Sequence, residues 1–209
     1  MACNTAKSSA STAVTVPSSP EYASPSPVAK GEQVAVFSGG CFWGVEAVFE
    51  HVKGVTDVRS GYSGGSKETA DYETVSGGKT GHAESVKIKF DPSVVSYAQL
   101  LEVFFSVAHD PTQLNYQGPD HGTQYRSSIF YTDEGQHQAA LAYIEKLKQD
   151  KVYSAPIVTQ VVPLEAFYDA ETYHQDYMKH NPNEPYIVYN DAPKVAALKK
   201  KFPDRYVEK

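Results

Sequence analysis

A strand, two glycines and an amphipathic helix follow one another between residues 33 and 52. The segment QVAVF (33–37) is apolar and β-branched, which predicts a buried strand. Gly39 and Gly40 interrupt this pattern. The apolar residues after them recur at the i, i+3, i+4 and i+7 positions of one helix face, namely Val45, Val48, Phe49 and Val52. Cys41 therefore lies at a strand–glycine–helix junction, at or beside the N-terminus of the helix.

The rest of the chain alternates between predicted strands and helices. Apolar, β-branched runs predict further strands at 82–90, 123–131 and 157–162. Periodicity and capping residues predict helices that open at Ser96 and that cover about 133–149, 172–180 and 193–201. Two segments rich in polar residues are predicted to be long surface loops, 58–82 and 109–122. This alternation, without a regular βαβ repeat, is typical of an α+β fold or of a mixed two-layer sheet.

Residues 1–32 differ in composition from the rest. From Asn4 to Lys30, 19 of 27 positions are Ser, Thr, Ala or Pro, and such a segment cannot bury enough surface to offset its ordering entropy. We therefore predict a disordered tail or tether, followed by a single folded domain at 33–209. The beginning MAC is similar to the mature end of a bacterial lipoprotein, with Cys3 as the lipid-attachment residue in the cell envelope. The alternative is a ragged terminus on a cytoplasmic protein.

The composition excludes several classes of protein. The 209 residues include 19 Lys and Arg against 25 Asp and Glu, and the net charge of −6 lacks the basic surface of a nucleic-acid binder. No stretch approaches the ~18 uninterrupted apolar residues of a transmembrane segment. Two cysteines cannot form a disulfide scaffold or a cysteine-rich zinc site, and the seven histidines have no metal-binding spacing. We expect a monomer that binds a small molecule or a peptide and holds no metal.

Cys41 is the first candidate for chemistry. The unpaired N–H groups at a helix N-terminus stabilise a thiolate, which is the nucleophilic form of cysteine, and so lower the pKa of the thiol. A lone cysteine is more often an inert buried residue. Cys41, however, follows two glycines and lies off the apolar helix face, which favours reactivity. Phe42 and Trp43 form either an aromatic wall beside the sulfur or part of the core.

Glu84 is the second candidate, because of its place in the strand 82–90. Strand residues alternate between two faces, so the carboxyl group of Glu84 points the same way as Val86, Ile88 and Phe90. Desolvation among apolar side chains raises the pKa of a carboxyl group. A carboxylic acid that keeps its proton near neutral pH is suited to general-acid catalysis. The alternative is that Glu84, at the start of the strand, lies in solvent.

Three more polar residues lie in or at the edges of the two predicted loops: Tyr72, Asp120 and Tyr125. Tyrosines in such loops can donate hydrogen bonds to a substrate oxygen, and an aspartate can orient them. The chain contains 15 tyrosines, so their position alone does not separate these residues from ordinary surface residues.

Five motifs in one order give the folded part a resemblance to a known family. They are GCFWG (40–44), GYSGG (61–65), GHAESV (81–86), HDPTQLN (109–115) and DHGTQYRS (120–127). Over about residues 34–189 the chain resembles the A-type peptide-methionine sulfoxide reductases. The resemblance implies a two-layer α/β sandwich with a mixed sheet, of ferredoxin-like type. It also implies an oxidoreductase that repairs proteins under oxidative stress and needs no metal or bound cofactor.

Carried over residue by residue, the resemblance also implies a mechanism. Cys41 would attack the sulfur of methionine-S-sulfoxide, whether free or in peptides and oxidised proteins. Glu84 would protonate the sulfoxide oxygen, assisted by hydrogen bonds from Tyr72 and Tyr125. Asp120 would belong to the polar network that holds this site.

The same resemblance assigns the substrate pocket and raises the question of the reductant. Phe42 and Trp43 would form the pocket for the S-methyl group. Attack would leave a sulfenic acid, which a thiol must reduce. Many family members carry further cysteines for this step, but this chain has none after Cys41. The implied reductant is thioredoxin or another thiol, or else Cys3, a route that lipid on Cys3 would close. Tyr116 stands where the family pattern has a basic residue. This difference affects the expected peptide contacts at the rim of the site, but not the chemistry.

Two other classes of function compete with a reductase. The first is a cysteine hydrolase that pairs Cys41 with His82 or His121 and forms an acyl-enzyme without consuming reductant. The second is a non-catalytic module that binds oxidised methionine and tolerates Cys41→Ser. A protonated Glu84 favours the reductase, because such a hydrolase needs an ionised base.

Overall fold

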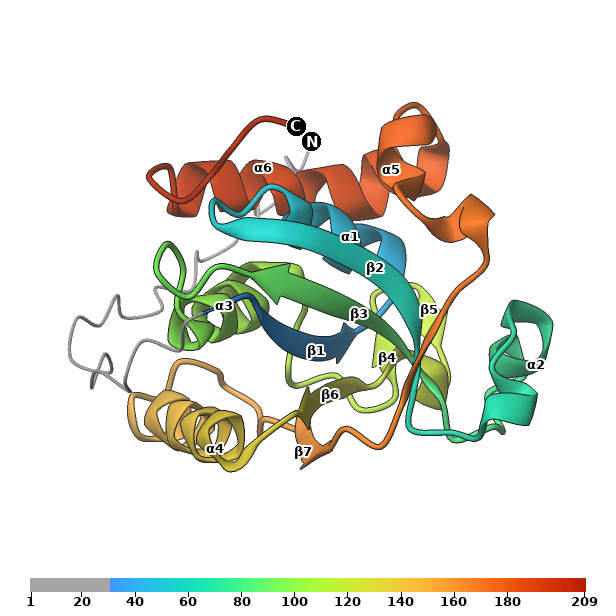
Figure 1. Cartoon of the computed structure of the whole chain (residues 1–209), viewed down its shortest axis with the longest axis horizontal. Helices are drawn as coiled ribbons and strands as arrows, with labels where there is room; N and C mark the ends of the chain where they lie inside the picture. Colours follow the sequence, from blue (N-terminus) through green and yellow to red (C-terminus); the bar gives the residue numbers. More distant parts are fainter. Residues whose placement is uncertain (1–30) are drawn as a thin grey trace, which may run out of the picture.

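The computed structural model describes residues 31–209, and Figure 1 shows how their helices and strands are arranged. The predicted tail, apart from its last two residues, lies outside the described residues, and so does Cys3. The roles predicted for them, as a tether, a lipid-attachment residue or a resolving thiol, stay predictions.

A six-stranded sheet in the order β7-β6-β1-β3-β2-β8 forms the centre of the fold. Its strands are β1 (Gln33–Gly39), β2 (Val55–Ser63), β3 (Ala83–Phe90), β6 (Ser127–Tyr131), β7 (Gln160–Pro163) and β8 (Phe167–Asp169). Neighbouring strands are antiparallel except β6 and β7, which are parallel. The predicted mixed sheet is therefore confirmed. Two short strands, β4 (Tyr116–Gln117) and β5 (Asp120–His121), form a separate hairpin.

The predicted helices lie close to their expected positions. The helix Tyr72–Ser76 was not expected, because it lies inside the segment 58–82 that we predicted to be a loop, and that prediction is wrong here. In the described part of the chain the α-helices are α1 (Phe42–Glu50), α2 (Tyr72–Ser76), α3 (Tyr97–Val103), α4 (Glu134–Gln149), α5 (Tyr177–His180) and α6 (Ala192–Lys201). The capping box predicted at Ser96 and Gln99 is confirmed at the start of α3. Short 3-10 turns and π-helical turns complete the fold: η1 (Lys67–Thr69), η2 (Phe104–Ala108), η3 (Thr123–Tyr125), η4 (Thr172–His174) and η5 (Ile187–Asp191).

The helices bury their apolar faces against one side of the sheet. Alternation along β1 and β3 directs one set of side chains to that side, namely Ala35, Phe37, Val86 and Ile88. These residues form one continuous core with apolar residues of α1, α3, α4 and α6. A small cluster around Val36 and Phe130 covers part of the opposite side. The fold is a single mixed α/β domain, in which α6 packs on the outside of α1 (Figure 1).

Strand β2 lies partly where we expected a loop. Its residues from Val58 onward belong to the segment 58–82, so that expectation is wrong for this part. The strand pairs with β3 and β8 inside the sheet, and its residues 60–63 are buried. Its Arg and Ser residues are not among the strand-favouring types and its glycine is disfavoured in strands, but pairing on both sides overrides this. Gly61 is required because the carbonyl oxygen of Tyr168 lies 2.3 Å from the position of a Cβ atom.

Two other strand boundaries also differ from the expectation. The strand predicted at 123–131 begins only at Ser127, because the preceding residues form the 3-10 turn η3. The strand predicted at 157–162 is β7, and β8 had no sequence signal. As a consequence, Tyr125 projects from a turn rather than from the sheet.

Candidate active site

Cys41 is the N-cap residue of α1, where the chain leaves β1. Gly40, the residue before it, has a φ of +93°, and a Cβ atom there would stand 2.6 Å from the Cβ of Gln117. Only glycine combines this backbone conformation with this close approach. The predicted strand–glycine–helix junction is confirmed, but Cys41 itself is buried, with 7% of its surface exposed.

The pKa of the Cys41 thiol differs from the sequence-based expectation. Burial raises this pKa well above its usual value, and the carboxyl groups of Glu84 and Asp191 raise it further. The backbone N–H of Trp43 and the charge of Lys194 lower it, with smaller effects. The expectation that the helix N-terminus would give Cys41 a low pKa is therefore wrong. At neutral pH the resting group is a thiol, and its proton has to leave during any nucleophilic reaction.

Glu84 lies on the buried face of β3, as its spacing predicted. The side chain is 3% exposed, and its Oε2 accepts a hydrogen bond of 3.1 Å from the backbone N–H of Phe42. Burial raises the pKa of Glu84 to about 8, with smaller contributions from the charges of Asp120 and Asp191. The carboxyl group is therefore protonated at neutral pH. It is hydrogen-bonded to the backbone of Phe42, the residue directly after Cys41.

Tyr72 and Tyr125 come from separate segments, and the charges of the same three residues, Cys41, Glu84 and Asp120, act on both. Tyr72 is the first residue of α2, and Tyr125 ends η3. Burial raises the pKa of each phenol, and so do the charges of Glu84, Cys41 and Asp120. Both hydroxyl groups therefore keep their protons and can donate hydrogen bonds.

Asp120 is connected to a residue that the sequence did not single out. The hydroxyl group of Tyr186 donates a hydrogen bond to Oδ2 of Asp120, across 66 positions of sequence. Burial raises the pKa of Tyr186, with further contributions from Cys41 and Asp120, so Tyr186 also faces the sulfur. This contact closes the site between the β4–β5 hairpin and the C-terminal segment.

The two aromatic residues after Cys41 have different surroundings. Phe42 is 1% exposed and packs against Tyr62 and His174, with ring centroids 5.9 and 5.0 Å away. Trp43 is half-buried and stacks on Tyr177 at 3.7 Å, with an interplanar angle of 6°. Phe42 therefore packs in the core, whereas Trp43 and Tyr177 form an aromatic wall.

His174 joins this aromatic wall to the polar part of the site. Its Nδ1 accepts a hydrogen bond of 3.1 Å from Nε1 of Trp43, and its ring lies 4.6 Å from that of Tyr72. Burial lowers the pKa of His174, so the ring is neutral at pH 7. Glu171 accepts hydrogen bonds from the hydroxyl of Tyr62 and the backbone N–H of Tyr72, both at 2.9 Å. No sequence signal identified either residue.

The profile of a protein family described as peptide methionine sulfoxide reductase matches residues 33–206. The chain belongs to the peptide methionine sulfoxide reductase family. It is 61% identical over 181 residues to the peptide methionine sulfoxide reductase MsrA 2 of Mesorhizobium japonicum, covering 87% of this chain and 93% of that protein. It is 52% identical over 180 residues to MsrA 2 of Synechocystis, covering 86% and 84%.

Solved structures of the family have the same fold. Reduced Mxr1 from Saccharomyces cerevisiae superposes with a TM-score of 0.67 at 32% identity, covering 73% of this chain and 87% of that chain. Methionine sulfoxide reductase A of Corynebacterium diphtheriae gives a TM-score of 0.63 at 32% identity, covering 73% and 76%. This agreement covers most of the folded domain.

The histidines proposed for a hydrolase do not pair with Cys41 in this family member. Nδ1 of His82 accepts a hydrogen bond from the backbone N–H of Gly65, and Nε2 lies 2.9 Å from the carbonyl oxygen of Ser66. Both ring nitrogens of His82 are thus engaged in the loop. His121 is exposed and stacks on Tyr116 at 5.4 Å. Among residues 31–209, neither histidine forms a hydrogen bond with Cys41.

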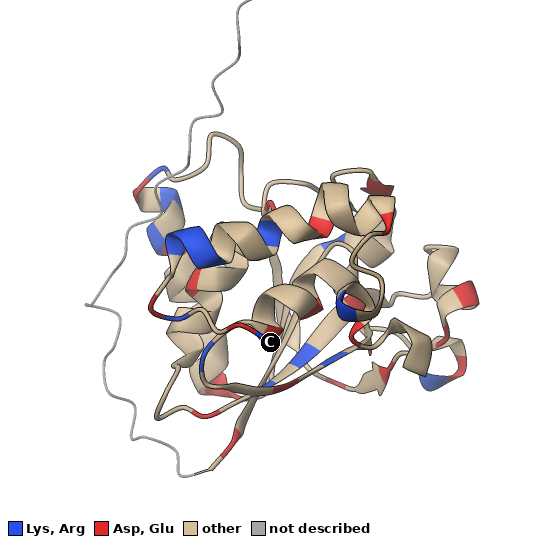
Figure 2. Ribbon diagram, turned by 90° about the horizontal axis from the view of Figure 1, so that it is seen from above, with Lys and Arg blue, Asp and Glu red and all other residues tan. Residues whose placement is uncertain are grey.

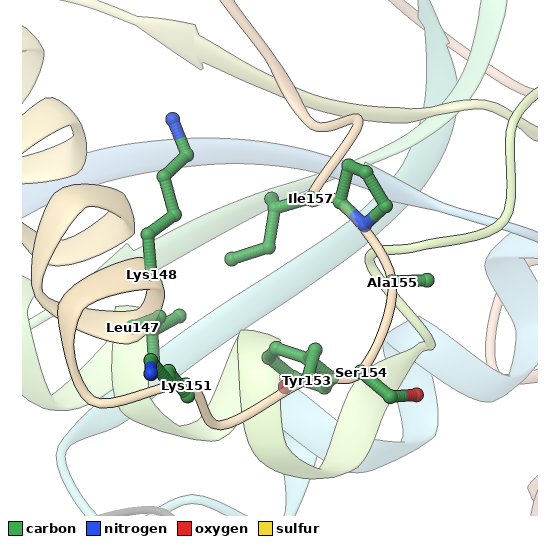
Figure 3. Close-up of a pocket in the computed structure, with 8 residues that line it drawn as sticks. Leu147, Lys148, Lys151, Tyr153, Ser154, Ala155 and Ile157 are labelled. Atoms are coloured by element: carbon green, nitrogen blue, oxygen red, sulfur yellow. The ribbon is translucent and has the colours of Figure 1, made fainter.

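Two cavities elsewhere in the described part of the chain are lined by none of the predicted site residues. A cavity of about 430 Å³ lies between the end of α4 and the loop after it and holds none of the predicted site residues (Figure 3). Acidic and basic residues are interspersed along the elements (Figure 2). Among residues 31–209, no group of three or more His, Cys, Asp or Glu side chains is arranged for a metal ion. In the same range, no helix has the length and apolarity to cross a membrane.

Proposed function

We propose that this chain reduces methionine-S-sulfoxide, free or in oxidised peptides and proteins, to methionine. The observation that carries the proposal is a carboxylic acid, Glu84, that keeps its proton at neutral pH beside the buried sulfur of Cys41. A sulfoxide oxygen can leave only when it is protonated, and a buried acid with a pKa of about 8 can supply that proton. Membership of the reductase family supports the same assignment.

In the first step, the sulfur of Cys41 attacks the sulfoxide sulfur while Glu84 donates its proton to the oxygen. Tyr72 and Tyr125 donate hydrogen bonds to that oxygen. The oxygen is transferred to Cys41, which becomes a sulfenic acid, and methionine is released. The thiol proton of Cys41 replaces the one that Glu84 gave up, so the acid is restored. The site begins and ends this step with the same number of protons.

The substrate side chain binds against Trp43, with Phe42 beneath it. The support for this pocket is the stacked pair of Trp43 and Tyr177, which presents a half-buried apolar surface beside Cys41. A methyl group on sulfur packs well against such rings. Asp120, held by Tyr186, lies on the other side of the site and orients the polar part of the substrate.

The second step consumes a thiol. The sulfenic acid of Cys41 is attacked by a thiolate, water leaves, and a disulfide forms between the two sulfurs. A second thiol on the same reductant then releases Cys41, as a dithiol protein of the thioredoxin type allows. Cys41 is the one free cysteine in the described range, so the reductant comes from another molecule or from Cys3.

Finer features of the architecture belong to the same proposal. We assign the catalytic domain to 33–209, preceded by a tail at 1–32, and expect the chain to act as a monomer. The order β6-β1-β3-β2, with antiparallel neighbours and with α1 and α3 as the connecting helices, supports a ferredoxin-like core. The match to the family profile begins at residue 33 and supports the domain boundary.

A single-turnover reaction tests the proposal. The enzyme is mixed without reductant with the separate S and R epimers of methionine sulfoxide, and methionine, intact mass and thiol content are measured. We expect one methionine per enzyme from the S epimer only, with Cys41 oxidised. A sulfenic acid in the mass spectrum indicates an external reductant, and a Cys3–Cys41 disulfide indicates an internal one. No methionine from either epimer would refute the reductase assignment.

A further inference from the structure

An ion pair with a buried carboxylate and a partly exposed lysine lies beside Cys41 and has no role in the mechanism above. Asp191, at the end of η5, is fully buried, and its Oδ1 is 3.1 Å from Nζ of Lys194 in α6. Its other oxygen, Oδ2, is also buried and has no hydrogen-bond partner among residues 31–209. A buried carboxylate that is only half satisfied is costly. Such a group therefore calls for an explanation.

The ion pair lies in close contact with the first turn of α1. A Cβ atom on Gly44 would stand 2.0 Å from Oδ1 of Asp191 and 2.9 Å from Nζ of Lys194. Both charged atoms therefore lie against the helix backbone only three residues after Cys41. Glycine at position 44 is what allows this approach, because any other side chain would displace the pair. The two charges have a fixed position relative to the sulfur.

Both charges act on the thiol, and burial of Asp191 limits the water that would screen its charge. Asp191 raises the pKa of Cys41, and Lys194 lowers it. The other titratable groups that face the sulfur or the pair come from every element packed around them, namely Glu84, Asp120, Tyr72, Tyr125, Tyr177, Tyr186 and His109. Lys194 is the cation in this set.

We propose that Asp191 and Lys194 are positioning residues that control the ionisation of Cys41, with Lys194 favouring the thiolate and Asp191 opposing it. In the resting protein the two charges oppose each other, and Cys41 remains a thiol. A thiol reacts slowly with peroxides, so this arrangement protects the sulfur from irreversible oxidation. The charge of Lys194 lowers the cost of forming the thiolate once the proton leaves. The effect of Asp191 and Lys194 on the ionisation of Cys41 does not depend on the proposed function. Only its importance for catalysis rests on that function.

The rate of Cys41 alkylation by iodoacetamide, measured against pH, tests the proposal. Peptide mass spectrometry of the full chain separates Cys41 from Cys3. Lys194→Met removes the positive charge and should move the profile to higher pH, by about one unit, or roughly tenfold in rate at a fixed pH. Asp191→Asn removes the negative charge and should move the profile to lower pH by a similar amount.

The opposite signs separate electrostatics from structure. Both substitutions break the same ion pair, so a merely structural role predicts shifts in the same direction. Lys194→Arg retains the charge and should restore the original profile. Lys200→Met, on the exposed side of the same helix, should leave the profile unchanged. Shifts of the same sign, or no shift in Lys194→Met, would overturn the proposal.

Two features keep this test decisive. If Asp191→Asn does not fold, the comparison of Lys194→Met with Lys194→Arg still decides whether the charge acts on Cys41. Alkylation requires no sulfoxide and no reductant. The alkylation profiles can therefore shift as expected in a protein that does not reduce methionine sulfoxide. Likewise, an active reductase can show no such shifts.

Discussion

Two buried carboxyl groups, Glu46 on α1 and Glu84 on β3, have similarly raised pKa values but different surroundings. Glu84 is 3% exposed and Glu46 is 2% exposed, and burial raises the pKa of each to about 8. Each accepts a hydrogen bond from a backbone N–H, Glu84 from Phe42 at 3.1 Å and Glu46 from Ser60 at 3.3 Å. Both therefore hold a proton at neutral pH.

The groups around them differ. The charge of Glu84 raises the pKa of the Cys41 thiol and the pKa values of the phenols of Tyr72 and Tyr125. After burial, the charges that raise the pKa of Glu46 are those of Glu50 and Asp176. No nucleophile and no aromatic wall are involved there. A raised pKa is therefore insufficient to identify a catalytic acid, and the neighbouring sulfur is what distinguishes Glu84.

The largest expected effect is that of Glu84→Gln. Glutamine keeps the shape but has no proton of suitable acidity to donate, so turnover of methionine-S-sulfoxide should fall by about 10²–10⁴-fold. Glu46→Gln is the matched control and should change turnover by less than about twofold, since Glu46 touches no reacting group. Single-turnover methionine formation measures both. Equal losses in the two variants would remove the distinction between the two carboxyl groups.

The pH dependence of turnover is the second way to test this comparison. Above pH 8 Glu84 loses its proton, so kcat should fall by up to about tenfold per pH unit. Alkylation of Cys41 should instead accelerate over the same range, because its thiol ionises at higher pH. A descending limb in Glu84→Gln as steep as in the unaltered protein would contradict the assignment.

Tyr186→Phe should have a smaller effect. The substitution removes the hydrogen bond to Asp120 and frees the carboxylate that we assign to the polar side of the substrate. Loss of one such bond corresponds to about tenfold in kcat/KM, mainly through KM. Tyr189→Phe, whose side chain is 80% exposed, is the control and should behave like the unaltered protein. A loss confined to kcat would place Tyr186 in the chemical step instead.

Local sequence patterns were enough to place one half of the candidate site on its helix and strand. Helical periodicity placed Cys41 at the start of α1, and strand alternation placed Glu84 on the buried face of β3. The C-terminal half of the site had no such pattern. Trp43 and His174 are 131 positions apart, and Asp120 and Tyr186 are 66 apart. Contacts at such separations depend on how the elements pack, which periodicity does not encode.

The pKa of Cys41 illustrates the same limit in electrostatic terms. A helix N-terminus can be read from the sequence, and its effect on a thiol has a known sign. The opposing effects come from burial, from Glu84 on β3 and from Asp191 on η5. The depth of the sulfur and the convergence of these carboxyl groups are properties of the packed fold. Strand β2 was missed for a related reason, because its pairing partners stabilise it rather than its own residues.

Glu46→Gln should have the smallest effect on activity, but it should change the stability of the protein. In the folded protein the pKa of Glu46 is about 8, above its usual value of 4.5, so the folded state holds the proton more tightly. The resulting stabilisation is fully present below about pH 4.5 and is lost as the pH rises through 8. Glu46→Gln keeps a neutral side chain at every pH. The free energy of unfolding should therefore fall less between pH 5 and 8 than in the unaltered protein, by about 3–4 kcal/mol.

Urea denaturation at several pH values measures this difference. Glu84→Gln should flatten the stability profile in the same way, because its pKa is raised by the same cause. The two variants would then agree in stability and disagree in turnover. That outcome would separate the energetic cost of a buried acid, which both residues share, from its catalytic use at Cys41. A profile unchanged in Glu46→Gln would mean that Glu46 is ionised in the folded protein, so that its resemblance to Glu84 is only geometric.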